Sequence, residues 1–242
     1  MIVGKALSPL VAAGLLVWTS APGVAQVGAF GGYYSSGMDQ FNYVLNRMQM
    51  QNILRKAEQR AGQGKAPPPP AAAGRPASTI VARAGAPVAP ERLAAHYPAA
   101  HRAQAAQTFR QILNGYGQLE TRLGLPAGDM AGAMAALIVG SWSVCRERDI
   151  IDGHFVAVAR QLRGAIGQDP RFAQVALADR QLAYEQFAIL GTELALLQMA
   201  LRQKPDAAVQ RRACEAGKGY LAQFGLDPMG IEIGAEGLVA AG

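Results

Sequence analysis

The sequence predicts an all-α protein, an antiparallel bundle of about five helices around a buried central helix at residues 129–146, with a basic, proline-rich N-terminal arm. Three observations support this fold class. Half of the 242 residues are hydrophobic but only 7% are aromatic, and abundant alanine favours helices over sheets. Apolar residues recur with helical spacing in several segments. The connections between these segments are short, as in antiparallel bundles.

The central helix is predicted from Asp129–Cys145, whose sequence is DMAGAMAALIVGSWSVC. Asp129 suits the N-cap position because its short carboxylate can accept hydrogen bonds from amides of the first turn. No charged residue follows before Arg146, and a helix that is apolar on nearly every side is normally buried on every side. The alternative is a membrane span, which needs about 20 apolar residues. We favour a core helix of a soluble bundle.

Four other helices are expected from apolar periodicity and from the glycine or proline that follows each periodic segment. They cover residues 99–123, 152–166, 179–203 and 206–224. Asp152 and Asp179 are expected to act as N-caps, and residues 172–177 to form a short turn or half-helix. The tail shows strand-like alternation only at Ile231-Glu232-Ile233. Because one short strand cannot form a sheet, we expect an extended segment packed on the bundle.

The first 25 residues are typical of a secretory signal peptide. Lys5 precedes an uncharged, mostly apolar stretch, and Gly23 and Ala25 are the small residues that a signal peptidase requires at the −3 and −1 positions. The alternative is an N-terminal membrane anchor. A signal peptide cleaved near Ala25 predicts a periplasmic or secreted bacterial protein that folds in an oxidising compartment.

Two segments separate this predicted signal peptide from a helical domain at residues 91–242. Residues 26–61 contain one amphipathic helix, from residue 38 to residue 61, which is expected to dock on the core or on a partner helix. Residues 62–90 form a linker in which seven of the 29 residues are proline. Such a composition is typical of extended, semi-rigid spacers.

The positive charge of the chain is concentrated in this arm. Residues 26–90 hold seven basic and two acidic residues, a net charge of +5, whereas residues 91–242 hold fifteen of each and sum to zero. The basic residues are dispersed and no aromatic residues are interleaved with them, so nucleic-acid binding is not expected. The arm is interpreted either as a solvated tail or as a segment that contacts anionic envelope polymers or lipid headgroups. An unidentified protein partner is also expected.

The two cysteines, Cys145 and Cys214, are predicted to form a disulfide because export leads to an oxidising compartment. The bond would join the end of the central helix to the last helix and stabilise the fold by about 2–4 kcal/mol. A buried pair of free thiols is the alternative. Their spacing excludes a CxxC redox motif, and no set of zinc ligands accompanies them.

Histidine and serine residues offer little support for catalysis or metal binding. His96 and His101 are five residues apart and therefore do not share one face of a helix, as an i, i+4 metal pair would. We expect them and His154 at the surface. Ser141 and Ser143 lie outside any GxSxG motif, and no strand precedes them to form a nucleophile elbow.

Acidic residues of the longest predicted helix are the best candidates for a polar site. Glu185 and Glu193 could face one groove, as the carboxylate pair of a glycosidase would. Glu185, near Arg180 and Gln181, is interpreted first as a polar contact between helices. It is also the best candidate for a functionally placed polar residue. No cofactor and no metal site are predicted, because nucleotide, haem and EF-hand motifs are absent from the sequence.

Three stretches of apolar and small residues resemble a family of uncharacterised exported bacterial proteins, a domain of unknown function. They are FRQILNGYGQLETRLGLPAGDMAGAMAALIV, DRQLAYEQFAILG and YLAQFGLDPMGIEIGAEGL. The resemblance spans roughly residues 109–238 and leaves the arm outside it. It implies a helical exported domain, and it brings no activity and no site residues to this chain.

These observations favour a non-catalytic binding, adaptor or structural component of the envelope that acts by surface recognition. Two alternatives stay open. An envelope hydrolase without a recognised motif would show titratable groups converging on a concave pocket. A small-molecule or lipid binder would show an apolar cavity between helices, which we would expect to be lined by Met130, Met134 and Trp142.

Overall fold

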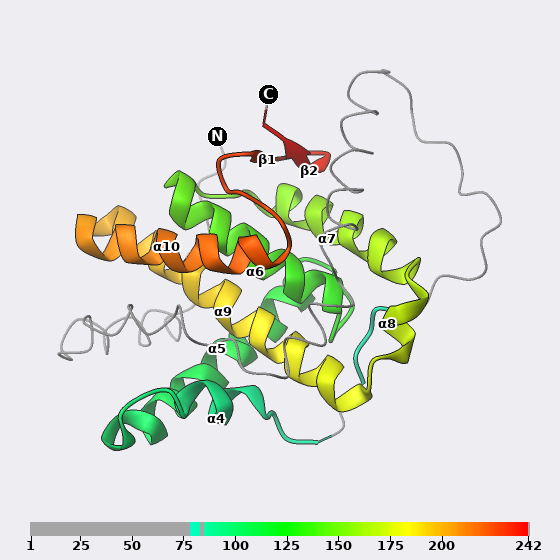
Figure 1. Ribbon diagram of the computed structural model, residues 1–242, viewed down its shortest axis with the longest axis horizontal. Helices are drawn as coiled ribbons and strands as arrows, with labels where there is room; N and C mark the ends of the chain where they lie inside the picture. The colour runs from blue at the N-terminus through cyan, green and yellow to red at the C-terminus, as the bar shows by residue number, and fades with distance from the viewer. Residues whose placement is uncertain (1–77, 83–84, 242) are drawn as a thin grey trace.

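The computed structural model describes residues 78–82 and 85–241, which form a helical bundle with a small C-terminal sheet (Figure 1). The elements of these ranges, in chain order, are α4 (Ala89–Ala94), η2 (Ala99–His101), α5 (Arg102–Arg122), α6 (Met130–Arg146), α7 (Asp152–Gly167), α8 (Pro170–Gln174), α9 (Leu177–Gln203), α10 (Ala207–Gln223), β1 (Ile231–Gly234) and β2 (Gly237–Ala240). The predicted all-α fold class is confirmed. The predicted signal peptide and the predicted helix at residues 38–61 lie outside the described residues, as does most of the linker.

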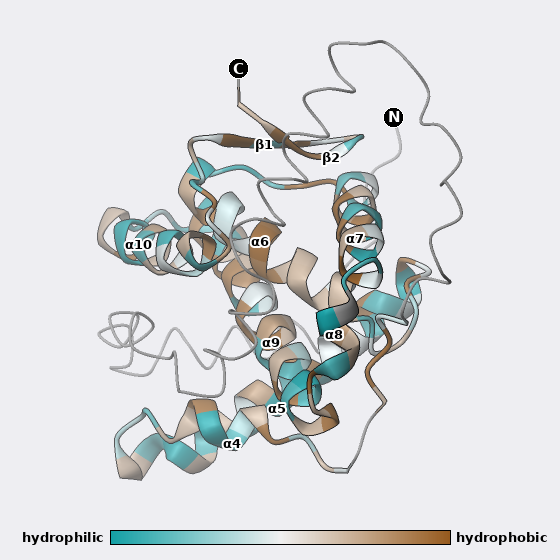
Figure 2. Cartoon of the chain, turned by 45° about the vertical axis from the view of Figure 1, so that its right-hand side comes forward, coloured by the Kyte–Doolittle hydropathy of each residue, from teal (hydrophilic) through white to brown (hydrophobic). Residues whose placement is uncertain are grey.

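Helix α6 is the buried centre of the bundle, as predicted. The side chain of Asp129 caps it by accepting a hydrogen bond from the N–H of Ala131, and every residue from Met130 to Val144 is buried. Helices α7, α9 and α10 pack around it, and Figure 2 shows hydrophobic residues on α6 inside a bundle whose outer helices carry the hydrophilic ones. Among the helices of the described ranges, none is long and apolar enough to span a membrane.

The longest helix, α9, packs against α6 in the same direction along the chain. A Cβ atom added at Gly191 would lie 2.2 Å from the backbone carbon of Ala136, so the two helix backbones are in direct contact there. Farther along, Asp149, just beyond α6, forms an ion pair with Arg202 near the end of α9. The glycine allows an approach that any side chain would prevent.

Two of the predicted N-caps are wrong by a few residues. The N-cap of α7 is Ile151 and the N-cap of α9 is Ala176, and neither side chain accepts a capping hydrogen bond. Asp152 and Asp179 lie instead within the first turns of these helices. A carboxylate in the first turn is still favourable because it interacts with the positive end of the helix dipole, which explains why the sequence signal resembled a cap.

The tail forms a two-stranded antiparallel sheet, so the prediction of a single extended segment is wrong. Strand β1 pairs with β2 in a register that places Ile233 opposite Leu238. The side chain of Gln161 in α7 bonds both backbone groups of Leu238, donating to its carbonyl at 3.0 Å and accepting from its N–H at 2.8 Å. Trp142 donates to the carbonyl of Ile231 at 3.0 Å. The small sheet is therefore held by side chains of α6 and α7.

Candidate functional site

The N-terminus of α6 carries a buried polar cluster centred on Asp129, which is fully shielded from solvent. One carboxylate oxygen accepts hydrogen bonds from the hydroxyl of Thr79 at 2.6 Å and from the N–H of Ala131 at 3.3 Å. The other accepts from the guanidinium of Arg163, whose Nε lies at 3.1 Å. A buried carboxylate needs such compensation, and here it is supplied by three separate segments of the chain.

Glu120, from α5, adds a second buried carboxylate to the cluster. It accepts hydrogen bonds from the backbone N–H groups of Gly128 and Asp129, both at 3.2 Å, and from the hydroxyl of Tyr184 at 3.0 Å. Burial raises the pKa of Glu120, and these three hydrogen bonds oppose that rise. Burial and the neighbouring charge of Glu120 likewise raise the pKa of Tyr116, whose hydroxyl lies in the same region.

The cluster fixes the first described segment of the chain, residues 78–82, to the core. Ile80 pairs with Asp129 in an antiparallel bridge. The N–H of Val81 donates to the carbonyl of Gly128 at 2.9 Å, and the N–H of Met130 donates to the carbonyl of Thr79 at 3.0 Å. We call Thr79, Tyr116, Glu120, Asp129, Arg163 and Tyr184 the Asp129 cluster. Its carboxylates hold backbone groups and side chains in place, so the role of the cluster is structural.

The predicted polar site is brought together only in part. Glu185 is buried, and one of its oxygens accepts hydrogen bonds from the N–H groups of Val88 and Ala89 at 2.8 and 2.9 Å. Its other oxygen accepts from the side-chain amide of Gln181 at 2.8 Å. The guanidinium of Arg180 lies over the ring of Phe172, 5.6 Å from its centre. Glu185 therefore caps the N-terminus of α4 from a neighbouring helix.

The proposed carboxylate pair does not converge on one point. The carboxylate of Glu185 is held by the start of α4, whereas Glu193 lies eight residues farther along α9, about 12 Å along the helix axis. Glu193 is buried, and within the described part of the chain its two carboxylate oxygens have no hydrogen-bond partner. Because no donor offsets its burial, the pKa of Glu193 is raised to about 8.

The predicted disulfide is present between Cys145 and Cys214, whose Cα atoms are 4.5 Å apart. It joins the last turn of α6 to α10 and closes a loop of 69 residues. The bond fixes the end of the central helix against its neighbour.

The residues expected to line a ligand pocket belong to the packed core. Met130, Met134 and Trp142 are all at most 2% exposed. The indole N–H of Trp142 is bonded to β1, and the guanidinium groups of Arg146 and Arg148 lie 5.9 and 5.3 Å from its ring centre. The hydrogen bond of Trp142 joins the sheet to α6.

The remaining candidates are spread over the molecule. His96 and His101 are exposed and His154 is half-buried, so they are not gathered into one site. Ser141 and Ser143 are both buried within α6. Within the described ranges, no group of three potential metal ligands lies close enough together to hold an ion.

Sequence reasoning found Asp129 as a cap and missed the rest of its cluster. A usable signal existed in α5, where Leu113, Tyr116 and Glu120 follow the i, i+3, i+7 spacing of a buried face and are all buried. A carboxylate at such a position requires a buried partner. The partners, Tyr184 and the N-terminus of α6, could not be named without the tertiary structure.

Comparison with known protein families identifies the family of nearly the whole chain. The profile of the family of unknown function DUF6683 matches residues 6–241. The chain belongs to this family. The match begins well before the stretch of roughly residues 109–238 that carries the resemblance in sequence, and it includes the N-terminal arm. No curated protein and no solved structure matches the chain.

Proposed function

We propose that this DUF6683 protein is an exported, non-catalytic component of the bacterial envelope, in which the helical domain holds a basic, proline-rich arm that binds anionic surfaces. One observation carries the proposal. The buried carboxylates of the domain hold the end of the arm, Asp129 through Thr79 and Glu185 through Val88 and Ala89. The C-terminal end of the arm is therefore fixed to the helical domain at a defined position.

The chemistry of the buried acids supports an anchoring function. General acid–base catalysis needs a titratable group within reach of substrate, whereas Asp129, Glu120 and Glu185 are each bonded to backbone N–H groups. The disulfide between Cys145 and Cys214 supports export, because disulfides persist in oxidising compartments.

The linker supplies the charge for surface binding. Residues 62–90 contain Lys65, Arg75 and Arg83 and no acidic residue. Each basic side chain near an anionic membrane surface contributes about 1 kcal/mol of attraction. A proline-rich composition favours an extended chain, and an extended chain would let all three charges reach a flat, negatively charged surface.

Binding of the full-length protein to phosphatidylglycerol-containing vesicles tests this proposal, with phosphatidylcholine vesicles as the neutral reference and alginate as an anionic polysaccharide. The triple variant Lys65→Gln, Arg75→Gln, Arg83→Gln should bind the anionic vesicles about 100-fold more weakly, because three charges of about 1 kcal/mol each are removed. The binding of the unmodified protein should also fall as salt rises.

A matched control removes the same charge from the domain. Arg92, Lys204 and Arg211 are exposed, and their replacement by glutamine should leave vesicle binding within about twofold because they lie outside the arm. Equal losses in the two triple variants would show that net charge alone drives binding and would overturn the assignment to the arm. Binding to alginate but not to vesicles would identify the polymer as the surface recognised.

A further inference from the structure

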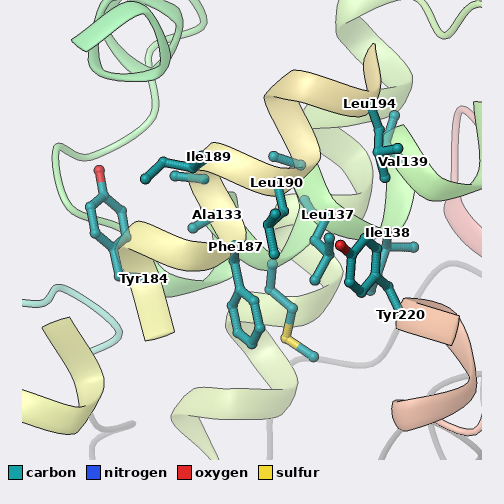
Figure 3. Close-up of a cluster of buried hydrophobic side chains, with 14 of the residues drawn as sticks. Ala133, Leu137, Ile138, Val139, Tyr184, Phe187, Ile189, Leu190, Leu194 and Tyr220 are labelled. Carbon is teal, nitrogen blue, oxygen red and sulfur yellow. The ribbon is translucent and has the colours of Figure 1, made fainter. Parts of the chain in front are cut away.

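Helix α5 is fixed to the bundle by one face. Its ring of Tyr116 meets the ring of Tyr184 edge to face, with centroids 6.1 Å apart, and Glu120 accepts a hydrogen bond from the hydroxyl of Tyr184. Figure 3 shows this hydroxyl pointing away from Phe187 and Leu190 of the core. The buried residues of α5 are Ala106, Phe109, Leu113, Tyr116 and Glu120. The opposite side of the helix therefore faces outward.

The outward side of α5 carries a row of side-chain amides. Glutamine or asparagine recurs there at i, i+3, i+7, i+10 and i+14, and this spacing keeps all five residues within about 80° of the helix circumference. We call them the amide stripe: Gln104, Gln107, Gln111, Asn114 and Gln118. All five are exposed. At 1.5 Å per residue the stripe is about 21 Å long, and between its ends no other residue falls in the same sector.

The amide stripe differs from an ordinary solvated helix face because it carries no charge. Exposed positions are usually rich in lysine, arginine, glutamate and aspartate, but Arg110 is turned about 70° from the middle of the stripe and pairs with Glu91, and Arg122 lies beyond its end. Each amide offers two N–H donors and two acceptor lone pairs. Within the described ranges, none of the five side-chain amides forms a hydrogen bond. The stripe is therefore a row of neutral, unused donors and acceptors.

A glycine leaves the helix backbone open beside the stripe. Gly115 lies four residues after Gln111 and three before Gln118, so it is a neighbour of both on the helix surface. A Cβ atom at Gly115 would meet nothing within 4 Å, so packing does not require glycine there, and glycine is unfavourable inside a helix. The gap gives a flat molecule access to the surface of α5 between two amides.

We propose that the amide stripe binds a neutral glycan strand. The absence of charge argues against an ionic ligand, and the absence of apolar side chains argues against a lipid or an amphipathic helix. Sugar hydroxyls are neutral and both donate and accept hydrogen bonds, as amides do. Successive amides are on average about 5 Å apart along the helix axis, which is close to the length of one sugar ring in an extended strand. Weak contacts of neighbouring rings add along such a repeated site.

This inference goes beyond surface binding by the arm, because it concerns other residues and an uncharged ligand. Attraction between the arm and an anionic surface weakens as salt rises, whereas hydrogen bonds between neutral groups are not screened. The vesicle assay and the experiment below therefore fail independently. A second copy of the chain is the competing occupant, but two amide stripes packed together bury polar groups without the apolar area that drives association.

Titration of the full-length protein with the hexasaccharide of β-1,4-linked N-acetylglucosamine tests the proposal, because this probe is neutral and extended. Calorimetry measures the affinity, and NMR follows the side-chain amide signals. The triple variant Gln107→Ala, Gln111→Ala, Asn114→Ala should bind at least about tenfold more weakly, since it removes several hydrogen-bonding groups. Alanine is the most favourable residue in a helix, so this variant should have a Tm no lower than that of the unmodified protein.

Exposed amides on other elements provide the matched control. Replacing Gln168, Gln174 and Gln203, which are all exposed, with alanine should leave the affinity within about twofold. Gly115→Leu should weaken binding because its side chain fills the gap beside the stripe. Gly164→Leu should not, although a Cβ atom there also meets nothing within 4 Å, because Gly164 lies on α7.

Three results would overturn the proposal. The first is a lack of hexasaccharide binding by the unmodified protein, and the second is an equal loss of affinity in the two triple variants. The third is self-association that rises with protein concentration, disappears in the stripe variant and is unaffected by the hexasaccharide, which would identify a second copy as the occupant.

Discussion

Replacing Gly191 with alanine should be among the most damaging small substitutions in this protein. A Cβ at this position would lie 2.2 Å from the carbonyl carbon of Ala136, 2.3 Å from the nitrogen of Leu137 and 2.4 Å from the oxygen of Ala136. Ordinary carbon contacts are about 3.5–4.0 Å. Because all three atoms belong to the backbone of α6, no side-chain rotation can relieve the clash, and the two central helices must move apart by more than about 1 Å.

The expected loss follows from the tight packing around this contact. Overpacking a core typically costs about 1–3 kcal/mol and occasionally more. Since Gly191 lies where the two central helices touch, we expect Gly191→Ala to lose about 3 kcal/mol of unfolding free energy. For a domain of this size, such a loss lowers Tm by about 6–12 °C. Urea unfolding followed by circular dichroism measures the free energy, and a thermal scan measures Tm.

Gly164 provides the matched control, because it lies within α7 and a Cβ there would meet nothing within 4 Å. Gly164→Ala should raise the unfolding free energy by about 0.5–1 kcal/mol, since alanine loses less backbone entropy in a helix. If Gly191→Ala proved as stable as the unmodified protein, direct contact between α6 and α9 would be refuted.

Three further perturbations address the polar cluster and the disulfide. Asp129→Asn removes the charge that faces Arg163 and should cost about 2–3 kcal/mol in urea unfolding, and no measurable loss would contradict the architectural assignment of the cluster. Cys145→Ser with Cys214→Ser should cost about 2–4 kcal/mol, and equal stability with and without reductant would show that the bond is dispensable. Burial raises the pKa of Glu120 above its value of 4.5, so its contribution to stability is complete below pH 4.5 and declines as pH rises through the folded pKa. Unfolding across this range should show a shallower decline in Glu120→Gln, and an unchanged pH dependence would contradict this.

Local sequence patterns were sufficient where one element carried its own signal. Helix α6 contains an uncharged run between Asp129 and Arg146, and its observed bounds, Met130–Arg146, match the positions of those two charges. Asp206 caps α10 by accepting from the N–H groups of Ala208 and Val209, and that helix was expected to start there. A cap and a run of buried residues are both encoded within a few neighbouring positions, which is why they can be read without a structure.

Local patterns failed where the decisive partner is far away in sequence. Strand β2, GLVA, has no alternation of apolar and polar residues. Its backbone at Leu238 is bonded by Gln161 of α7, a residue 77 positions away. The turn before it needs Gly237, whose φ is +97°, and glycine adopts such values without strain. Gly234 and Gly237, on either side of the two-residue turn, were the available signal for a hairpin. Only the alternating stretch at Ile231 was considered in the sequence, and the hairpin was therefore missed.

The same reasoning explains which parts of the candidate site were missed. Glu185 was singled out from the sequence, but its partners, the N–H groups of Val88 and Ala89, lie 97 and 96 residues away and could not be named. Glu120 bonds to Tyr184 across 64 residues. Sequence spacing can show that a carboxylate lies on a buried face, but only the packing of helices shows what it bonds to.

The buried acids of the described chain fall into two kinds, which differ in how the cost of burial is met. Asp129, Glu120 and Glu185 are compensated by backbone N–H groups, so removing any of them should disturb the fold. Glu193 is buried without such compensation, and burial raises its pKa to about 8. With a pKa of about 8, Glu193 is protonated at neutral pH, and the carboxyl group thereby avoids the cost of a buried, unpaired charge.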